Sequence, residues 1–223
     1  MPPAGIFLEK GKDEFLTPDQ IETLFTRVDG SYVFARWARP IVPVIFGVDD
    51  ATLSVLKGAI EAVVTLANHK MAETDPELGA NLMVFFIQDW AELVETPNMD
   101  QLIPDLASVV EQLVAANATQ YRAFRFDETG AIQACFSFVR MDEAMAALPA
   151  ETIALSQMVQ AILLWSDVAF AEQSPLAVLP DGGVTILRPE IAKIIRAAYD
   201  PVMPVAERDP SHALRLYARL DLG

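Results

Sequence analysis

The sequence predicts an α+β fold in which a mixed β-sheet with a β-hairpin packs against several helices. Segments with helical spacing alternate with short apolar segments of strand length, and two adjacent segments have the pattern of a hairpin. Of the 223 residues, 52% are hydrophobic, which supplies a core and excludes an intrinsically disordered chain. Because no repeat or low-complexity linker divides the chain, we expect one domain over residues 1–223, with residues 1–30 a candidate peripheral N-terminal segment.

Two helices are predicted in the first third of the chain. Thr17 is suited to cap the first, and Gln20 completes a capping box with it. Asp49 or Asp50 caps the second, which runs to about Asn68. Its polar residues recur every three or four positions among apolar ones, so we expect most of its circumference to be buried.

Two segments in the same part of the chain predict strands. The first, from Tyr32 to Gly47, is rich in β-forming residues but contains Pro40 and Pro43. Because proline cannot donate a hydrogen bond to a sheet ladder, we expect this strand at an edge of the sheet. Residues 81–87 form a continuous apolar run, which predicts an interior strand covered on both faces.

The clearest local signal is a hairpin. The segments Gln120–Phe126 and Ala131–Arg140 flank a four-residue connection that ends in Gly130, where a positive φ is wanted. Along the second strand, apolar side chains at alternate positions predict one buried face. They are Ile132, Ala134, Phe136 and Phe138.

Further helices are predicted from proline and capping residues. They cover residues 100–117, 150–165, 189–200 and 211–220. Asp100 and Pro104 open the first of them and Asn117 ends it, while Ser211 is suited to cap the last. Along the chain, helices and strands occur in mixed order, which predicts a sheet with helices packed on it.

Charge and hydropathy exclude several classes of protein. The net charge of −15 opposes binding to nucleic acid, because that binding depends on cationic side chains. Residues 49–118 hold twelve acidic and two basic residues, which we interpret as a solvated face, with a surface for a cation or a basic partner as the alternative. No apolar run approaches the roughly 18 residues of a membrane-spanning helix, so we expect no membrane insertion.

Cysteine and histidine usage bounds the chemistry. Cys135 is the single cysteine, and His69 and His212 are the two histidines, so a Cys/His metal site is not expected. The N-terminal residues lack the pattern of a signal peptide, which favours a cytoplasmic protein. A periplasmic or secreted protein whose signal peptide was removed before cloning would have the same sequence.

One polar pattern stands out inside the apolar helix predicted over residues 150–165. Ser156, Gln157 and Gln160 form a single polar stripe, because offsets of one and four place them on one side of a helix. Two interpretations are open. The stripe forms hydrogen bonds inside the core that fix the orientation of the helix, or it lines a pocket.

The spacing of this stripe resembles that of the zincin peptidases. There, a buried helix after a hairpin carries His-Glu-x-x-His, in which the histidines bind zinc and the glutamate is the base. Here the segment Ser156–Gln160 reads Ser-Gln-Met-Val-Gln, without a ligand or a carboxylate. The longer metzincin pattern would also need a glycine at Leu163 and a third ligand at Ser166, and neither is present.

The chain order is similar to the metzincin half-domain as well: a strand, a long helix and further strands that end in a hairpin. The chain also resembles a family of uncharacterised bacterial proteins with that layout. The segments that carry this resemblance are Phe34–Ile41, Ala80–Val84, Leu187–Glu190 and Ala198–Pro201. The resemblance implies a pseudoenzyme without zinc chemistry that is retained for binding.

Other candidate sites rest on charged and aromatic residues. Arg36 and Trp37 offer a cation and an aromatic ring to an anionic ligand, although a tryptophan on a strand is also a core residue. The carboxylates that follow the two predicted strands could gather at one end of the sheet and bind Mg²⁺ or Ca²⁺, or cap helices instead. They are Asp49, Asp50, Asp89, Glu92 and Glu95.

These observations predict a non-catalytic binding protein with a peptidase-like domain. We expect it to bind a peptide, a protein or a small ligand over the stripe of Ser156, Gln157 and Gln160, without a cofactor or a metal. Two alternatives remain open. One is a hydrolase that uses carboxylates and a divalent cation. The other is a structural subunit of an assembly, which exposed tryptophans or exposure of the basic strip of His212, Arg215 and Arg219 on the last helix would favour.

Overall fold

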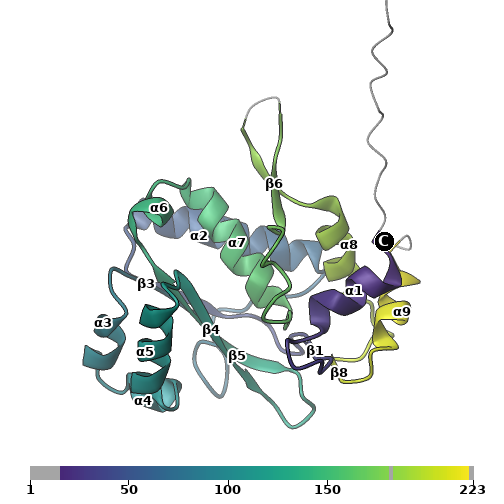
Figure 1. Cartoon of the computed structure of the whole chain (residues 1–223), viewed down its shortest axis with the longest axis horizontal. Helices are drawn as coiled ribbons and strands as arrows, with labels where there is room; N and C mark the ends of the chain where they lie inside the picture. The colour runs from purple at the N-terminus through teal and green to yellow at the C-terminus, as the bar shows by residue number, and fades with distance from the viewer. Residues whose placement is uncertain (1–15, 181–182, 221–223) are drawn as a thin grey trace, which may run out of the picture.

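The computed structural model describes residues 16–180 and 183–220, and its centre is a mixed four-stranded sheet (Figure 1). The order of the strands across the sheet is β2 (Pro43–Phe46), β3 (Leu82–Ile87), β5 (Ile132–Arg140) and β4 (Gln120–Phe126). The first three strands are parallel, and β4 is antiparallel to β5. With helices packed on it, this sheet confirms the predicted α+β class.

Helices cover both faces of the sheet, and each face has its own core. On one face α2 (Asp50–Leu66) and α7 (Ala150–Ile162) pack against each other (Figure 1). Short helices cover the other face: α3 (Ala91–Glu95), α4 (Met99–Leu102) and α5 (Leu106–Ala115). Side chains of β3 alternate between the two cores, which is why residues 81–87 are apolar without interruption.

Shorter elements complete the described residues. They are α1 (Pro18–Phe25), β1 (Phe34–Ala35), α6 (Glu143–Ala146), β6 (Leu176–Val178), β7 (Thr185–Leu187), α8 (Pro189–Ala198), β8 (Ala206–Glu207) and α9 (His212–Tyr217). α1 packs against α9, and Ile21 and Phe25 on α1 are fully buried. The described part of the predicted peripheral segment therefore contributes to the core.

Two features concern the surface. The hairpin of β6 and β7 projects from the body of the molecule (Figure 1), and Val178 and Val184 on it are exposed. None of the helices in the described part of the chain is long and apolar enough to cross a lipid bilayer.

Several local predictions are confirmed. Thr17 and Gln20 form the capping box of α1, and Asp49 accepts a hydrogen bond from the Thr52 amide at the start of α2. The strand predicted from Tyr32 to Gly47 is divided in two: β2, which begins at Pro43, lies at an edge of the main sheet as proline requires, whereas β1 pairs with β8 in a separate two-stranded sheet. Gly130 has a φ of +82° in the β4–β5 connection. Each of these features depends on residues within a few positions of one another.

The helix predicted over residues 100–117 is wrong in its extent. The structure has two helices there, α4 and α5, and residues 103–105 lie between them. Ile103 is extended because Pro104 follows it and disfavours helical geometry in the preceding residue. Asp105 has a left-handed φ of +53° and starts α5 without a side-chain capping bond.

Three other local predictions are corrected. α7 ends at Ile162 rather than Trp165, because Leu163 is extended and the Leu164 amide donates to the Ala35 carbonyl. Ser211 has helical geometry and no side-chain capping bond to α9. Ile132 lies in the core under α7, apart from Ala134, because the register of β5 against β4 shifts after Arg125. The sequence Asp181-Gly182-Gly183 also predicts a turn, and the first two of these residues lie outside the described residues.

Candidate functional site

The stripe predicted on α7 faces the sheet. Gln157 is buried, with 4% of its surface exposed, and Ser156 and Gln160 are half-buried. The Gln157 Oε1 accepts a hydrogen bond of 3.0 Å from the Ser137 hydroxyl on β5. The Gln160 Nε2 donates to the Ser156 hydroxyl over 3.0 Å. The structure therefore brings the three predicted residues together at the contact between α7 and the sheet.

An arginine on β4 completes this stripe. The Arg122 Nη1 donates to the Oε1 of Gln157 over 2.9 Å and to the Oε1 of Gln120 over 3.2 Å. The Nη2 group donates to the Oε1 of Gln160. Three amide oxygens thus point at one guanidinium. Because arginine has no acceptor, only the oxygen end of each amide can face it, so the orientation of the three amides is fixed. We call Gln120, Arg122, Ser137, Gln157 and Gln160 the Arg122 cluster.

The charge of Arg122 has no counter-ion among residues 16–180 and 183–220. No carboxylate oxygen of these residues lies within ion-pair distance of the guanidinium. Burial lowers the pKa of Arg122 because the guanidinium loses water, but arginine remains charged at neutral pH. Three of its five N–H groups donate to amides, and no described residue accepts from the others.

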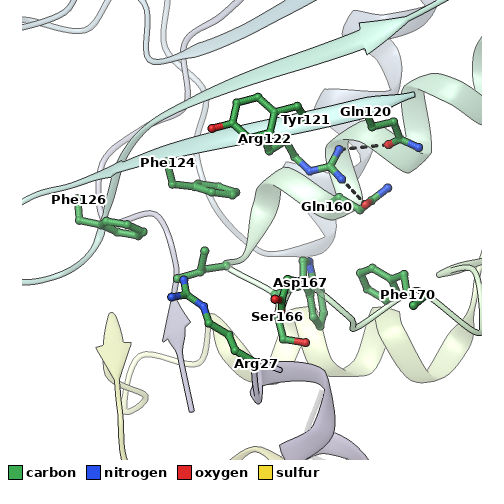
Figure 2. A pocket seen from close by; sticks show the side chains of 13 residues that line it. Arg27, Gln120, Tyr121, Arg122, Phe124, Phe126, Gln160, Ser166, Asp167 and Phe170 are labelled. Carbon is green, nitrogen blue, oxygen red and sulfur yellow. Dashed lines mark hydrogen bonds between the residues drawn. The ribbon is translucent and has the colours of Figure 1, made fainter. Parts of the chain in front are cut away.

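A cleft of about 730 Å³ lies beside Arg122 and Gln160. Figure 2 shows Gln120, Arg122, Phe124 and Phe126 along β4 on one side and Ser166, Asp167 and Phe170 on the other. The remaining lining residues are Arg27, Tyr121, Leu164, Trp165 and Ala171. The cleft thus has a polar end at Arg122 and Gln160 and aromatic rings along its walls.

The second wall of the cleft is anchored to the core. The Leu164 amide donates to the Ala35 carbonyl over 2.8 Å, and the Ser166 amide donates to the Leu24 carbonyl over 2.9 Å. The Trp165 Nε1 donates to the Val159 carbonyl, and its ring stacks on Phe25 at 5.2 Å between centroids. The Ser166 hydroxyl is buried and has no hydrogen-bond partner among the described residues. The wall therefore holds its shape without a ligand.

The first wall is the open edge of the sheet. The Arg140 amide donates to the Thr119 carbonyl, so in the alternating pattern of an antiparallel pair Tyr121, Ala123 and Arg125 bond to β5. The main-chain groups of Arg122 and Phe124 therefore point away from β5. No described strand pairs with this side of β4. The cleft is lined by Tyr121 from one face of β4 and by Arg122 and Phe124 from the other. The cleft therefore runs alongside the edge of the strand.

Arg36 and Trp37 do not line this cleft. Trp37 is fully buried, and its Nε1 donates to the Ala161 carbonyl over 2.9 Å. The Arg36 guanidinium lies 5.2 Å from the ring centre of Tyr199 and donates to the Met203 carbonyl. The two residues tie β1 to α7 and to the segment after α8.

Three of the carboxylates at the strand ends, Asp49, Asp89 and Glu92, accept hydrogen bonds from main-chain amides. β2 and β3 are parallel, as the interpretation of these residues assumed. Asp89 accepts a hydrogen bond from the Ala91 amide, and Glu92 accepts from the amides of Gln88 and Asp89. Within the part of the chain that the structure describes, no group of three or more His, Cys, Asp or Glu residues could hold a metal ion.

Of the features that would favour an assembly subunit, the tryptophans are buried, and the basic strip of His212, Arg215 and Arg219 is exposed only at Arg215. The three tryptophans are buried, at 0%, 0% and 8% exposure for Trp37, Trp90 and Trp165. His212 of the basic strip is fully buried, where its Nδ1 shares a hydrogen bond with the Tyr32 hydroxyl. Arg219 forms an ion pair with Asp200.

The sequence reasoning missed the β4 half of the site. Gln120, Arg122, Phe124 and Phe126 alternate with other residues along a segment that was predicted as a strand. That alternation places all four on one face. The alternation could therefore have predicted that these four side chains lie together. Only the pairing of β4 with β5 shows that their face meets α7. In comparisons with known proteins, no family model, curated protein or solved structure matches this chain.

Proposed function

We propose that this chain is a non-catalytic binding protein whose cleft, between β4 and the segment that follows α7, takes a segment of extended peptide. The observation that carries the proposal is the open edge of β4, which forms one wall of a cleft with a preformed second wall. A peptide that lies along this edge would add a fifth strand to the sheet. The main-chain groups of Arg122 and Phe124 would then find partners.

The side chains of the cleft suit a peptide as well. In an added strand, alternate side chains point to opposite faces of the sheet. Those on the side of the second wall would meet the aromatic rings of Phe124, Trp165 and Phe170. Aromatic pockets contribute affinity and select among side chains, while the main-chain hydrogen bonds accept any sequence.

The composition of the cleft supports a binding role rather than catalysis. Ser156 lies outside the lining of the cleft, and its hydroxyl accepts a hydrogen bond from Gln160; the amides of Gln120 and Gln160, which do line the cleft, cannot act as general bases. Neither histidine lines the cleft: His69 bonds the Arg39 carbonyl, and His212 bonds Tyr32. The hydroxyl of Ser166, the serine that lines the cleft, has no hydrogen-bond partner among the described residues. A serine without an adjacent base is a weak nucleophile.

The peptidase-like part of the proposal rests on chain order. α7 follows the β4–β5 hairpin, packs on the sheet beside α2 and presents its Ser-Gln-x-x-Gln stripe toward β4. These are the features by which the chain resembles a zincin half-domain. The residues at the ligand positions of that motif are here engaged with Arg122 or with each other.

The test uses a library of hexapeptides and the hydrogen exchange of individual amides. Binding of a library member should slow exchange of the Phe124 amide, which faces the open edge, while the Ala123 amide is protected by β5 in both states. The substitution Phe124→Pro removes the outward N–H group and should abolish binding. Phe124→Leu keeps that group and an apolar side chain, so it should bind within about threefold of the unmodified protein.

Phe124→Pro removes no hydrogen bond between β4 and β5, because the Phe124 N–H group faces away from β5 and proline is tolerated at such positions. The far-ultraviolet spectrum should therefore be retained. Failure of every hexapeptide to bind at about 1 mM would refute the proposal. So would peptide binding that leaves the Phe124 amide unchanged.

A further inference from the structure

We infer that the bound peptide carries a carboxylate, and that Arg122 is the group that recognises it. This inference rests on the proposed function and names the chemistry of its ligand. It starts from the guanidinium of Arg122, which lines the cleft and has no acidic partner among the described residues.

The surroundings of Arg122 leave its charge open. The side chains that hold it are Gln120, Gln157 and Gln160, which are neutral. They orient the guanidinium and satisfy part of its hydrogen-bonding capacity without cancelling its charge. A half-buried cation without a counter-ion gains more from an anion than an exposed one does, because the local dielectric is lower.

The N–H groups that remain match a carboxylate. One lies on Nε and one on Nη2, and no described residue accepts from them. Arginine binds planar carboxylates through two N–H groups at once, and such charge-assisted pairs are among the stronger hydrogen bonds in proteins.

The charge around the cleft favours a single negative charge. Arg27 and Arg122 line it together with Asp167, so its lining is net positive, although the chain as a whole has a net charge of −15. A carboxylate balances the one net positive charge of this lining, whereas a dianion such as a phosphate group would leave an unbalanced negative charge beside the exposed carboxylate of Asp167. The carboxylate belongs either to the C-terminus of the peptide or to an aspartate or glutamate side chain.

The experiment compares peptides of one sequence by calorimetry. The probe is acetyl-Thr-Val-Thr-Phe-Val with a free C-terminus, and its matched form is the C-terminal amide. Loss of a charged hydrogen-bonded pair should weaken binding of the amide roughly tenfold or more. A third peptide, amidated and with glutamate in place of its second threonine, reports whether a side-chain carboxylate restores the affinity.

Variants of the two arginines on β4 locate the effect. Arg122→Met should weaken binding of the acid about tenfold and leave acid and amide equal. Arg125→Met makes the same change of charge on the opposite face, where Arg125 donates to the Leu102 carbonyl, and should leave the acid-to-amide ratio intact. If Arg122→Met does not fold, Arg122→Lys keeps the charge without the planar pair of donors and should reduce the ratio severalfold.

The outcomes separate the two proposals. Equal binding of acid, amide and glutamate peptides, with protection of the Phe124 amide, would overturn the carboxylate inference and leave peptide binding standing. Absence of binding by all three peptides, together with failure of the hexapeptide library, would overturn both. Tighter binding of an amidated phosphoserine peptide than of either carboxylate form would also overturn the inference.

Discussion

Two polar clusters lie in the interior of this protein, and they treat their arginines differently. The first, which we call the Asn81 cluster, consists of Arg39, Asp75, Glu77 and Asn81. In it the Arg39 Nη1 lies 3.3 Å from the Asp75 Oδ2 and 3.0 Å from the Glu77 Oε2. In the Arg122 cluster the arginine has amide oxygens alone around it. One arginine is neutralised by carboxylates of its own chain, and the other is left charged at the edge of a cleft.

The Asn81 cluster has the properties of a structural site. Asn81 is fully buried, and its side chain bonds the Val42 amide, the Pro40 carbonyl and Asp75. Asp75 also accepts from the amides of Glu77 and Leu78. The Asn81 side chain and Asp75 thus have partners within the chain, whereas the charge of Arg122 has no counter-ion among the described residues. The comparison teaches that unmet charge, rather than burial or polarity, distinguishes the candidate binding site.

The largest effect is expected at Asn81. Asn81→Leu keeps the number and branching of the side-chain heavy atoms but leaves the buried Val42 amide and the Pro40 carbonyl without partners, so the free energy of unfolding should fall by about 3–5 kcal/mol. Urea denaturation at pH 7 measures it. Glu77→Gln alters an exposed ion pair of the same cluster and should cost about 0.5 kcal/mol or less. A loss below about 1 kcal/mol for Asn81→Leu would contradict the structural role of this cluster.

A second effect concerns His212, a titratable group that is sealed in the core beside Tyr32. Burial, and then the charge of Arg215, lower the pKa of His212 to about 4, so the folded protein holds this imidazole neutral. The unfolded chain takes up the proton near pH 6.5, and the free energy of unfolding should therefore fall by about 3 kcal/mol from pH 7 to pH 4 through this residue.

The variant His212→Gln isolates this contribution, because other groups titrate alike in both proteins. Urea denaturation at pH 7 and at pH 4 should show that the unmodified protein loses about 3 kcal/mol more than the variant. Parallel losses in the two proteins would show that His212 is not the group responsible.

The smallest effect is expected at Arg122 itself. Arg122→Met removes hydrogen bonds but also relieves the cost of burying a charge, so the free energy of unfolding should change by less than about 1 kcal/mol. Arg39→Met leaves the buried Asp75 without its cation and should cost about 2 kcal/mol. Denaturation of the two variants side by side measures the difference. A larger loss at Arg122 than at Arg39 would assign the Arg122 cluster to stability instead of binding.

The fold was more predictable than the site. The capping box at Thr17, the edge position of the strand with Pro43 and the hairpin at Gly130 follow from local chemistry, and all are present. The end of α7 was not predictable in this way. Leu163 leaves the helix because the next residue pairs with Ala35, about 130 positions earlier in the sequence.

The candidate site shows the same division. Ser156, Gln157 and Gln160 could be placed on one side of a helix from their spacing, and the structure brings them together. Arg36 and Trp37 could not be assigned to the core from sequence, because burial depends on how α7 and Tyr199 pack around them. Arg122 was overlooked because nothing near it in the sequence shows that its charge has no partner.

The sequence by itself determined the α+β class, the hairpin and the polar stripe on an apolar helix, since each depends on the periodicity and turn chemistry of neighbouring residues. Only the tertiary structure decided that Arg122 reaches this stripe. Its hydrogen bonds to Gln157 and Gln160 join residues 35 and 38 positions apart. Such contacts form when a strand edge and a helix pack together, and no local spacing encodes which polar groups will then lack a counter-charge.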